Sequence, residues 1–120
     1  MKGDDLSERL VNFSSRIINL ANSLPKTTVG NTVCLQVVRS GTSTGANYEE
    51  ARAAESKSDF IHKLSLSLKE LRETRYWLLV IDRSKLIPTK RMKNLILESE
   101  ELCNIIAKSI ITVRKKNNLK

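Results

Sequence analysis

The chain has 120 residues, a formal net charge of +8 at pH 7 and only 4% aromatic residues. This length suits a single domain over residues 1–120 with one hydrophobic core and no disulfide staple. The scarcity of aromatic, proline and glycine residues argues against a β-sandwich or barrel, which needs many turns and β-rich segments. We therefore expect an all-α protein.

The cysteines and the apolar segments indicate the cellular compartment in which the protein resides. Cys34 and Cys103 stand alone, without the spacing of a disulfide framework or a metal site. Residues 1–10 are too polar for a signal peptide, and the longest apolar run, residues 76–81, is far shorter than the roughly 18 residues of a membrane span. We expect a reduced cytoplasmic protein with no membrane partner.

The first predicted helix covers about residues 5–24. Its apolar residues recur at alternating gaps of three and four, which places them on one side of a helix. Asp5 is the expected N-cap, with Glu8 as its reciprocal capping partner, and Pro25 is expected to end the helix. The stripe consists of Leu6, Leu10, Phe13, Ile17, Leu20 and Leu24.

The second predicted helix covers about residues 28–54. Its first half has an apolar side formed by Val29, Val33, Leu35, Val37 and Val38. Residues 39–47 are rich in Gly, Ser and Thr, and propensity alone favours a loop there. Strong helix formers resume at once, so we expect one long helix whose small residues allow close packing against a neighbour.

The third and fourth predicted helices cover about residues 58–84 and 88–115. Ser56 or Ser58 can cap the third, and Pro88 fits the first turn of the fourth. Short connections make successive helices antiparallel, so an up-down-up-down four-helix bundle is predicted. The two stripes are Ile61, Leu64, Leu68, Leu71 and Leu78, and then Met92, Leu95, Ser99, Leu102, Ile106, Ile110 and Val113.

More than one side of several helices is apolar, because residues such as Ile17 and Ile18 are adjacent and point about 100° apart. Either the core-facing stripe is wide, or a second surface is buried by self-association. The neighbouring Tyr76 and Trp77 favour an interface, where aromatic residues are enriched.

Residues for catalysis are sparse. His62 is the only histidine and has no cysteine or second histidine at ligand spacing. The serines lack a nucleophile elbow, and the glycines lack the phosphate-loop patterns. We expect no catalytic residue, no metal and no cofactor.

One polar set shares a side of the second helix by its spacing. It can be a network that fixes helix register or a ligand site, and we favour the network because buried polar groups need partners. The set is Arg39, Ser43, Asn47 and Glu50.

The positive charge lies in the second half of the chain. Residues 57–87 carry seven basic and four acidic residues, and residues 88–120 carry eight and three. An anionic partner such as RNA or DNA is indicated. The candidate contacts lie at opposite ends of the fourth helix, so they cannot form one patch within a monomer. They are Lys90, Arg91 and Lys93, and Arg114, Lys115, Lys116 and Lys120.

Three blocks in the second helix resemble a known pattern: residues 39–43 (RSGTS), residues 45–48 (GANY) and residues 50–51 (EA). Further matches follow at residues 59–61, 63–64, 69–70, 73–74 and 76–78. The pattern is similar to that of the bacterial four-helix bundle family known as the 23S ribosomal RNA intervening-sequence proteins.

The resemblance implies an antiparallel bundle whose second helix runs straight through the Gly/Ser/Thr stretch. Members are similar to the accessory protein of diversity-generating retroelements, a basic pentameric ring that partners a reverse transcriptase and nucleic acid. We therefore expect a non-enzymatic homopentamer that binds RNA or DNA, with Tyr48, Tyr76 and Trp77 as candidate interface residues. The alternative is a protein-interaction adaptor, such as a reverse-transcriptase accessory subunit, with no direct role in nucleic-acid binding.

Overall fold

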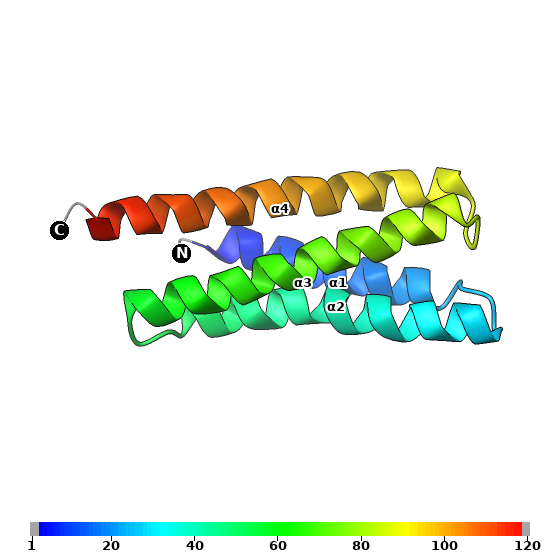
Figure 1. Ribbon diagram of the computed structural model, residues 1–120, viewed down its shortest axis with the longest axis horizontal. Helices are drawn as coiled ribbons and strands as arrows, with labels where there is room; N and C mark the ends of the chain where they lie inside the picture. Colours follow the sequence, from blue (N-terminus) through cyan, green and yellow to red (C-terminus); the bar gives the residue numbers. More distant parts are fainter. Residues whose placement is uncertain (1–2, 119–120) are drawn as a thin grey trace.

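The computed structural model describes residues 3–118, which form an elongated bundle of four helices measuring 53 × 23 × 21 Å. The helices are α1 (Asp4–Ala21), α2 (Thr28–Arg52), α3 (Lys57–Arg83) and α4 (Thr89–Asn118). Successive helices are antiparallel, and both ends of the chain lie at the same end of the bundle (Figure 1). The predicted up-down-up-down bundle is confirmed, and no strand occurs within the described range.

The starts of α2 and α3 are capped by hydroxyl side chains. The Thr27 hydroxyl accepts a hydrogen bond from the Gly30 amide at 3.0 Å, and the Ser56 hydroxyl accepts one from Asp59 at 3.0 Å. Each bond satisfies an amide that has no partner within its own helix. Ser56, rather than Ser58, is the cap of α3.

Both ends of α1 differ from the prediction. The N-cap is Gly3, whose φ of 93° is a left-handed conformation, and no side chain caps the helix. Asp5 therefore lies inside the first turn, and the predicted capping box with Glu8 is wrong. The helix ends at Ala21 rather than Leu24 because the amides of Ser23 and Leu24 bond the carbonyls three residues earlier.

The Gly/Ser/Thr stretch of α2 is helical throughout, as predicted. Ser40 and Thr44 are fully buried, and each hydroxyl donates to the carbonyl four residues earlier, so neither is an unpaired polar group in the core. A Cβ at Gly41 would lie 2.8 Å from Ile17 Cγ2, so the missing side chain lets α1 approach α2 closely. The Gly41 carbonyl also accepts a hydrogen bond from Ser14 at 3.3 Å.

The core contains nearly all of the predicted apolar stripes. Ser99, which interrupts the α4 stripe, is fully buried and donates to the Ile96 carbonyl at 2.6 Å. Two residues assigned to the apolar side of α2 are misplaced, because Val29 is 60% exposed and Leu35 is 72% exposed. Leu35 lies about 200° around the helix from the buried Val33, so the two cannot face the same core.

Candidate nucleic-acid interface

The two basic clusters of α4 lie at opposite ends of that helix, as their spacing predicted. Lys90 and Lys93 are exposed at its start, and Arg114 and Lys115 are exposed near its end. The 21 residues from Lys93 to Arg114 span about 30 Å at 1.5 Å per residue. The side chain of Lys116 is also exposed, and Lys120 lies outside the described residues. No single patch on the monomer contains both clusters.

Arg91 differs from its neighbours in the first cluster because its guanidinium has a partner within the chain. Its Nη2 donates to Ser23 Oγ at 2.8 Å, which joins the start of α4 to the turn after α1. Arg91 is thus a contact between two helices as well as a surface cation.

A basic groove between α3 and α4 brings Arg114, one member of the second α4 cluster, beside cations that the sequence analysis had not selected. We call this surface the α3–α4 groove and define it by Lys69, Arg72, Arg75, Arg114 and Cys103. One hollow of about 460 Å³ is lined by Lys69, Arg72 and Arg114. A second hollow of about 580 Å³ is lined by Arg72, Arg75 and Cys103.

The groove is basic because the charges of α3 are sorted around that helix. Glu70 and Glu73 face α2, where both bind the guanidinium of Arg39. Lys69 and Arg72, from the same stretch of sequence, line the groove beside α4 instead. The net charge of this stretch hides the separation, although the spacing of Lys69, Arg72 and Arg75 places these three cations along one side of α3.

Cys103 lies half-buried in the groove between its basic side chains. Burial raises the pKa of this thiol above its ordinary value, and the positive charges of Arg72 and Arg75 oppose that rise. Cys34 is also half-buried, on the other side of the bundle, with its sulfur 3.9 Å from the Ala21 carbonyl. The two thiols are therefore far apart in the fold and are not bridged.

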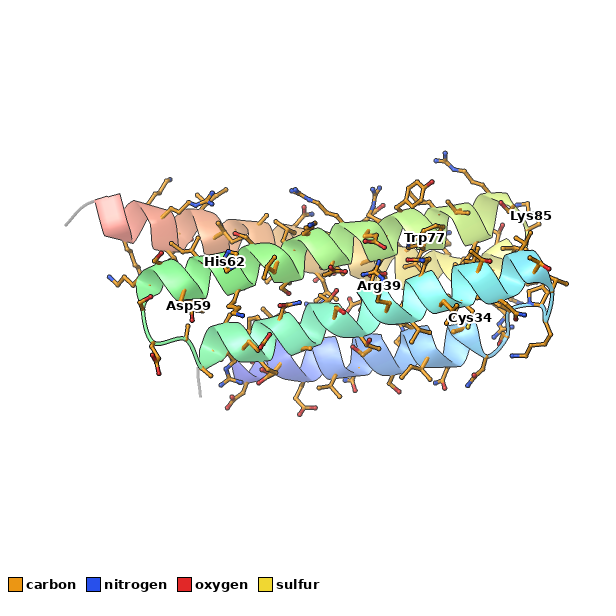
Figure 2. The ribbon with its side chains drawn as sticks, turned by 60° about the horizontal axis from the view of Figure 1, so that its bottom comes forward. Cys34, Arg39, Asp59, His62, Trp77 and Lys85 are labelled. Atoms are coloured by element: carbon orange, nitrogen blue, oxygen red, sulfur yellow. The ribbon has the colours of Figure 1, made fainter. Side chains whose placement is uncertain are left out.

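Arg39 is the member of the predicted polar set that reaches another helix. Its Nη1 lies 3.1 Å from Glu70 Oε2, and its Nη2 binds Glu73 Oε2, so one guanidinium joins α2 to two carboxylates of α3 (Figure 2). Two contacts from one guanidinium fix its orientation more specifically than a single surface pair does. Trp77 Nε1 also donates to Glu73, at 3.1 Å.

The other members of the set stay within α2. Ser43 donates to the Arg39 carbonyl at 2.6 Å, and Asn47 donates to the Ser43 carbonyl at 2.9 Å. The Glu50 side chain is exposed and forms no hydrogen bond or ion pair with any residue from 3 to 118. A contact that the sequence did not indicate lies deeper, where the buried Ser67 of α3 donates to the Thr44 carbonyl at 2.7 Å.

The three candidate interface residues have different environments. Tyr48 is only 7% exposed, and its hydroxyl donates to the Gly3 carbonyl at 3.3 Å. Its ring packs largely within the chain, and a contact with another subunit stays a prediction. Tyr76 is 58% exposed and meets Trp77 edge-on, with ring centroids 5.1 Å apart and an interplanar angle of 75°.

Chemistry outside these surfaces is limited in the part of the chain that the structure describes. His62 is exposed near the start of α3, close to Asp59 in Figure 2. Residues 3–118 contain no group of three or more His, Cys, Asp or Glu side chains that could hold a metal ion. None of the helices in that range combines the length and apolarity needed to cross a membrane.

One protein-family model matches most of the chain. The model of the 23S rRNA-intervening sequence proteins matches residues 5–108. The chain belongs to the 23S rRNA-intervening sequence protein family.

A solved structure agrees with this assignment. The chain is 36% identical to a protein with unknown function from the S23 ribosomal protein family of Bacteroides thetaiotaomicron. The two superpose with a TM-score of 0.81, and the match covers 87% of this chain and 96% of the other. No curated protein matches the chain.

The family match covers some of the candidate residues and not others. The part shared with the 23S rRNA-intervening sequence proteins includes all of α3, with Lys69, Arg72 and Arg75, and the first basic cluster of α4. It ends before Arg114, Lys115 and Lys116. Most of the α3–α4 groove thus lies within the family domain, whereas the second basic cluster follows it.

Proposed function

We propose that this member of the 23S rRNA-intervening sequence family is a non-enzymatic, homopentameric protein of the cytoplasm that binds RNA or DNA. The observation that carries the proposal is the placement of the charge. The excess of basic residues lies in residues 57–120, whose helices α3 and α4 pack side by side. Residues 1–56 carry equal numbers of basic and acidic residues, so one half of the bundle attracts polyanions and the other does not.

Exposed apolar residues on the neutral half support self-association. Val11 is 59% exposed and Ile18 is 45% exposed, and their spacing of seven places them on the same side of α1. Leu35 of α2 is 72% exposed. A pentamer built through α1 and α2 would leave α3 and α4 free, and five copies of a weak basic surface would bind a long polyanion multivalently.

The oligomeric state provides the first test. We expect light scattering at micromolar concentration to give five times the chain mass of 13.6 kDa. The double substitution Ile18→Lys with Leu35→Lys should reduce this mass, because it places charge in the proposed apolar contact. The matched control is Leu97→Lys on α4, where an equally exposed leucine should tolerate the change. A wild-type monomer would rule out the pentamer.

Nucleic-acid binding is tested by a salt series. We expect the affinity for a structured RNA or a DNA to fall linearly with salt on logarithmic axes, with a slope proportional to the number of phosphates contacted. Neutralising all six described candidate cations should lower this slope. These are Lys90, Arg91, Lys93, Arg114, Lys115 and Lys116. Absence of binding at low salt would leave the adaptor as the better proposal.

The adaptor alternative is supported by an apolar cleft at the end of the bundle where the chain begins and ends. The cleft has a volume of about 730 Å³, and Leu6, Phe60, Leu64, Ile105 and Val113 are among its lining residues. A partner protein, such as a reverse transcriptase, could insert apolar side chains there. A complex that survives nuclease treatment and is lost in Ile105→Lys would favour this role.

A further inference from the structure

The two hollows of the α3–α4 groove adjoin each other. Both are lined by Arg72 and Ala107, which lie between them. The lining residues of α4 run from Glu100 to Arg114, which corresponds to about 20 Å of helix. The surface is therefore an extended channel between two antiparallel helices rather than an isolated pocket.

The side chains of this channel leave an excess of positive charge. Glu100 is the acidic residue that lines it, and Arg75 already binds that carboxylate at 3.0 Å. Lys69, Arg72 and Arg114 are exposed and form no ion pair with any residue from 3 to 118. An occupant with several negative charges in a row complements this arrangement, whereas a single small anion would meet only part of it.

An aromatic ring lies on the same side of α3 as the unpaired cations. Tyr76 follows Arg72 by one helical turn and is 58% exposed. Its ring is supported edge-on by Trp77, whose indole nitrogen is fixed by the hydrogen bond to Glu73. An exposed aromatic ring held in place beside a basic channel is the combination that proteins use to bind unpaired bases.

We propose that the α3–α4 groove binds single-stranded nucleic acid, with phosphates on Lys69, Arg72 and Arg114 and a base stacked on Tyr76. This inference rests on the proposed function and specifies its site and its substrate class. A duplex supplies the phosphates, but its bases are already stacked on each other and cannot cover the tyrosine ring. Single strands should therefore bind more tightly than duplexes of the same length.

The first experiment compares two double variants that lose the same charge. Lys69→Gln with Arg72→Gln removes two groove cations, and Arg16→Gln with Lys26→Gln removes two exposed cations outside the groove. With a fluorescent oligonucleotide of mixed sequence, the groove variant should lower the salt slope by about 1.4, at about 0.7 per phosphate contact of a single strand. The control should keep the wild-type slope, and both should keep the wild-type melting temperature.

Two substitutions of Tyr76 test whether a base stacks on its ring. Tyr76→Ala should weaken single-strand binding about five- to 150-fold, the range measured for loss of one stacked base, without changing the salt slope. Tyr76→Phe keeps the ring and should bind as the wild type does. Equal losses in both variants would show that the hydroxyl, not stacking, matters.

The two cysteines give a readout that does not depend on affinity. Cys103 lines the groove and Cys34 does not, so a bound oligonucleotide should slow iodoacetamide alkylation of Cys103 and leave Cys34 unchanged. Mass spectrometry of the two peptides measures both rates in one sample. Equal protection of both thiols, or of neither, would place the strand elsewhere.

The outcomes separate this inference from the broader proposal. If wild-type protein binds no nucleic acid at low salt, the proposed function and the groove site both fail. If it binds but the Lys69 and Arg72 variant keeps the full slope and Cys103 stays reactive, only the groove site fails. Tighter binding of a duplex would overturn the preference for single strands.

Discussion

We expect Phe13→Ala to reduce the free energy of unfolding by about 3–5 kcal/mol, the cost of truncating a buried aromatic residue. Phe13 is 1% exposed in the middle of α1, with Leu10 and Ile17 buried one turn to either side. The loss is a large share of the 5–15 kcal/mol that stabilises a typical domain. In urea titrations the midpoint should fall while the slope m is unchanged.

A matched control lies at the preceding position. Asn12 is exposed in the same helix, so Asn12→Ala should change the stability by no more than about 0.5 kcal/mol. Both variants should be titrated at one protein concentration, because any association stabilises the folded chain. Equal effects of the two substitutions would mean that α1 is not packed on the core through this face.

The helical periodicity was sufficient to predict most of the fold. Phe13 and Ile17 could be assigned to the core because apolar residues at gaps of three and four can share one side of a helix only if that side is buried. The same argument placed Leu71 and Ile106, and both are fully buried. Periodicity works well here because each helix is long and each connection is short.

The prediction of the fold failed where backbone conformation or packing against a neighbouring helix determines the local structure. Asp5 carries the right side chain for a cap, but the N-cap is the left-handed Gly3, two residues earlier. In α2, hydroxyl residues such as Ser40 and Thr44 occupy the core-facing positions, because their own helix accepts their hydrogen bonds. Leu35 is exposed to solvent instead. Composition alone could not reveal that hydroxyl residues of α2 face the core while a leucine faces solvent.

The candidate site was only partly visible in the sequence for a related reason. Runs of cations in α4 stand out, whereas Lys69 and Arg72 are mixed with Glu70 and Glu73. The fold gives them different partners, because Arg39 of α2 binds both glutamates whereas Lys69 and Arg72 line the groove beside α4. The groove thus depends on which helix lies on each side of α3, and that is a property of the packed bundle.

The contact between α1 and α2 gives the second large expected effect. Gly41→Ala should be less stable than Gly45→Ala by about 1–3 kcal/mol, the usual cost of overpacking. A Cβ at position 41 would lie 2.8 Å from Ile17 Cγ2, and Ile17 is a buried β-branched side chain that cannot turn away. At position 45 the nearest atom is Leu10 Cβ at 3.4 Å, an ordinary contact.

The comparison isolates the packing of the two helices because both substitutions gain the same helix propensity, about 1 kcal/mol over glycine. Gly45→Ala should therefore melt at or above the wild-type temperature. Gly41→Ala should melt lower than Gly45→Ala by about 4 °C for each kcal/mol. Since α1 must shift to admit the new methyl group, Gly41→Ala should also weaken any assembly formed through α1 and α2 while leaving the α3–α4 groove intact. Equal melting temperatures would show that α1 can move away from α2 without loss, and that the close approach at Gly41 does not determine how the bundle is packed.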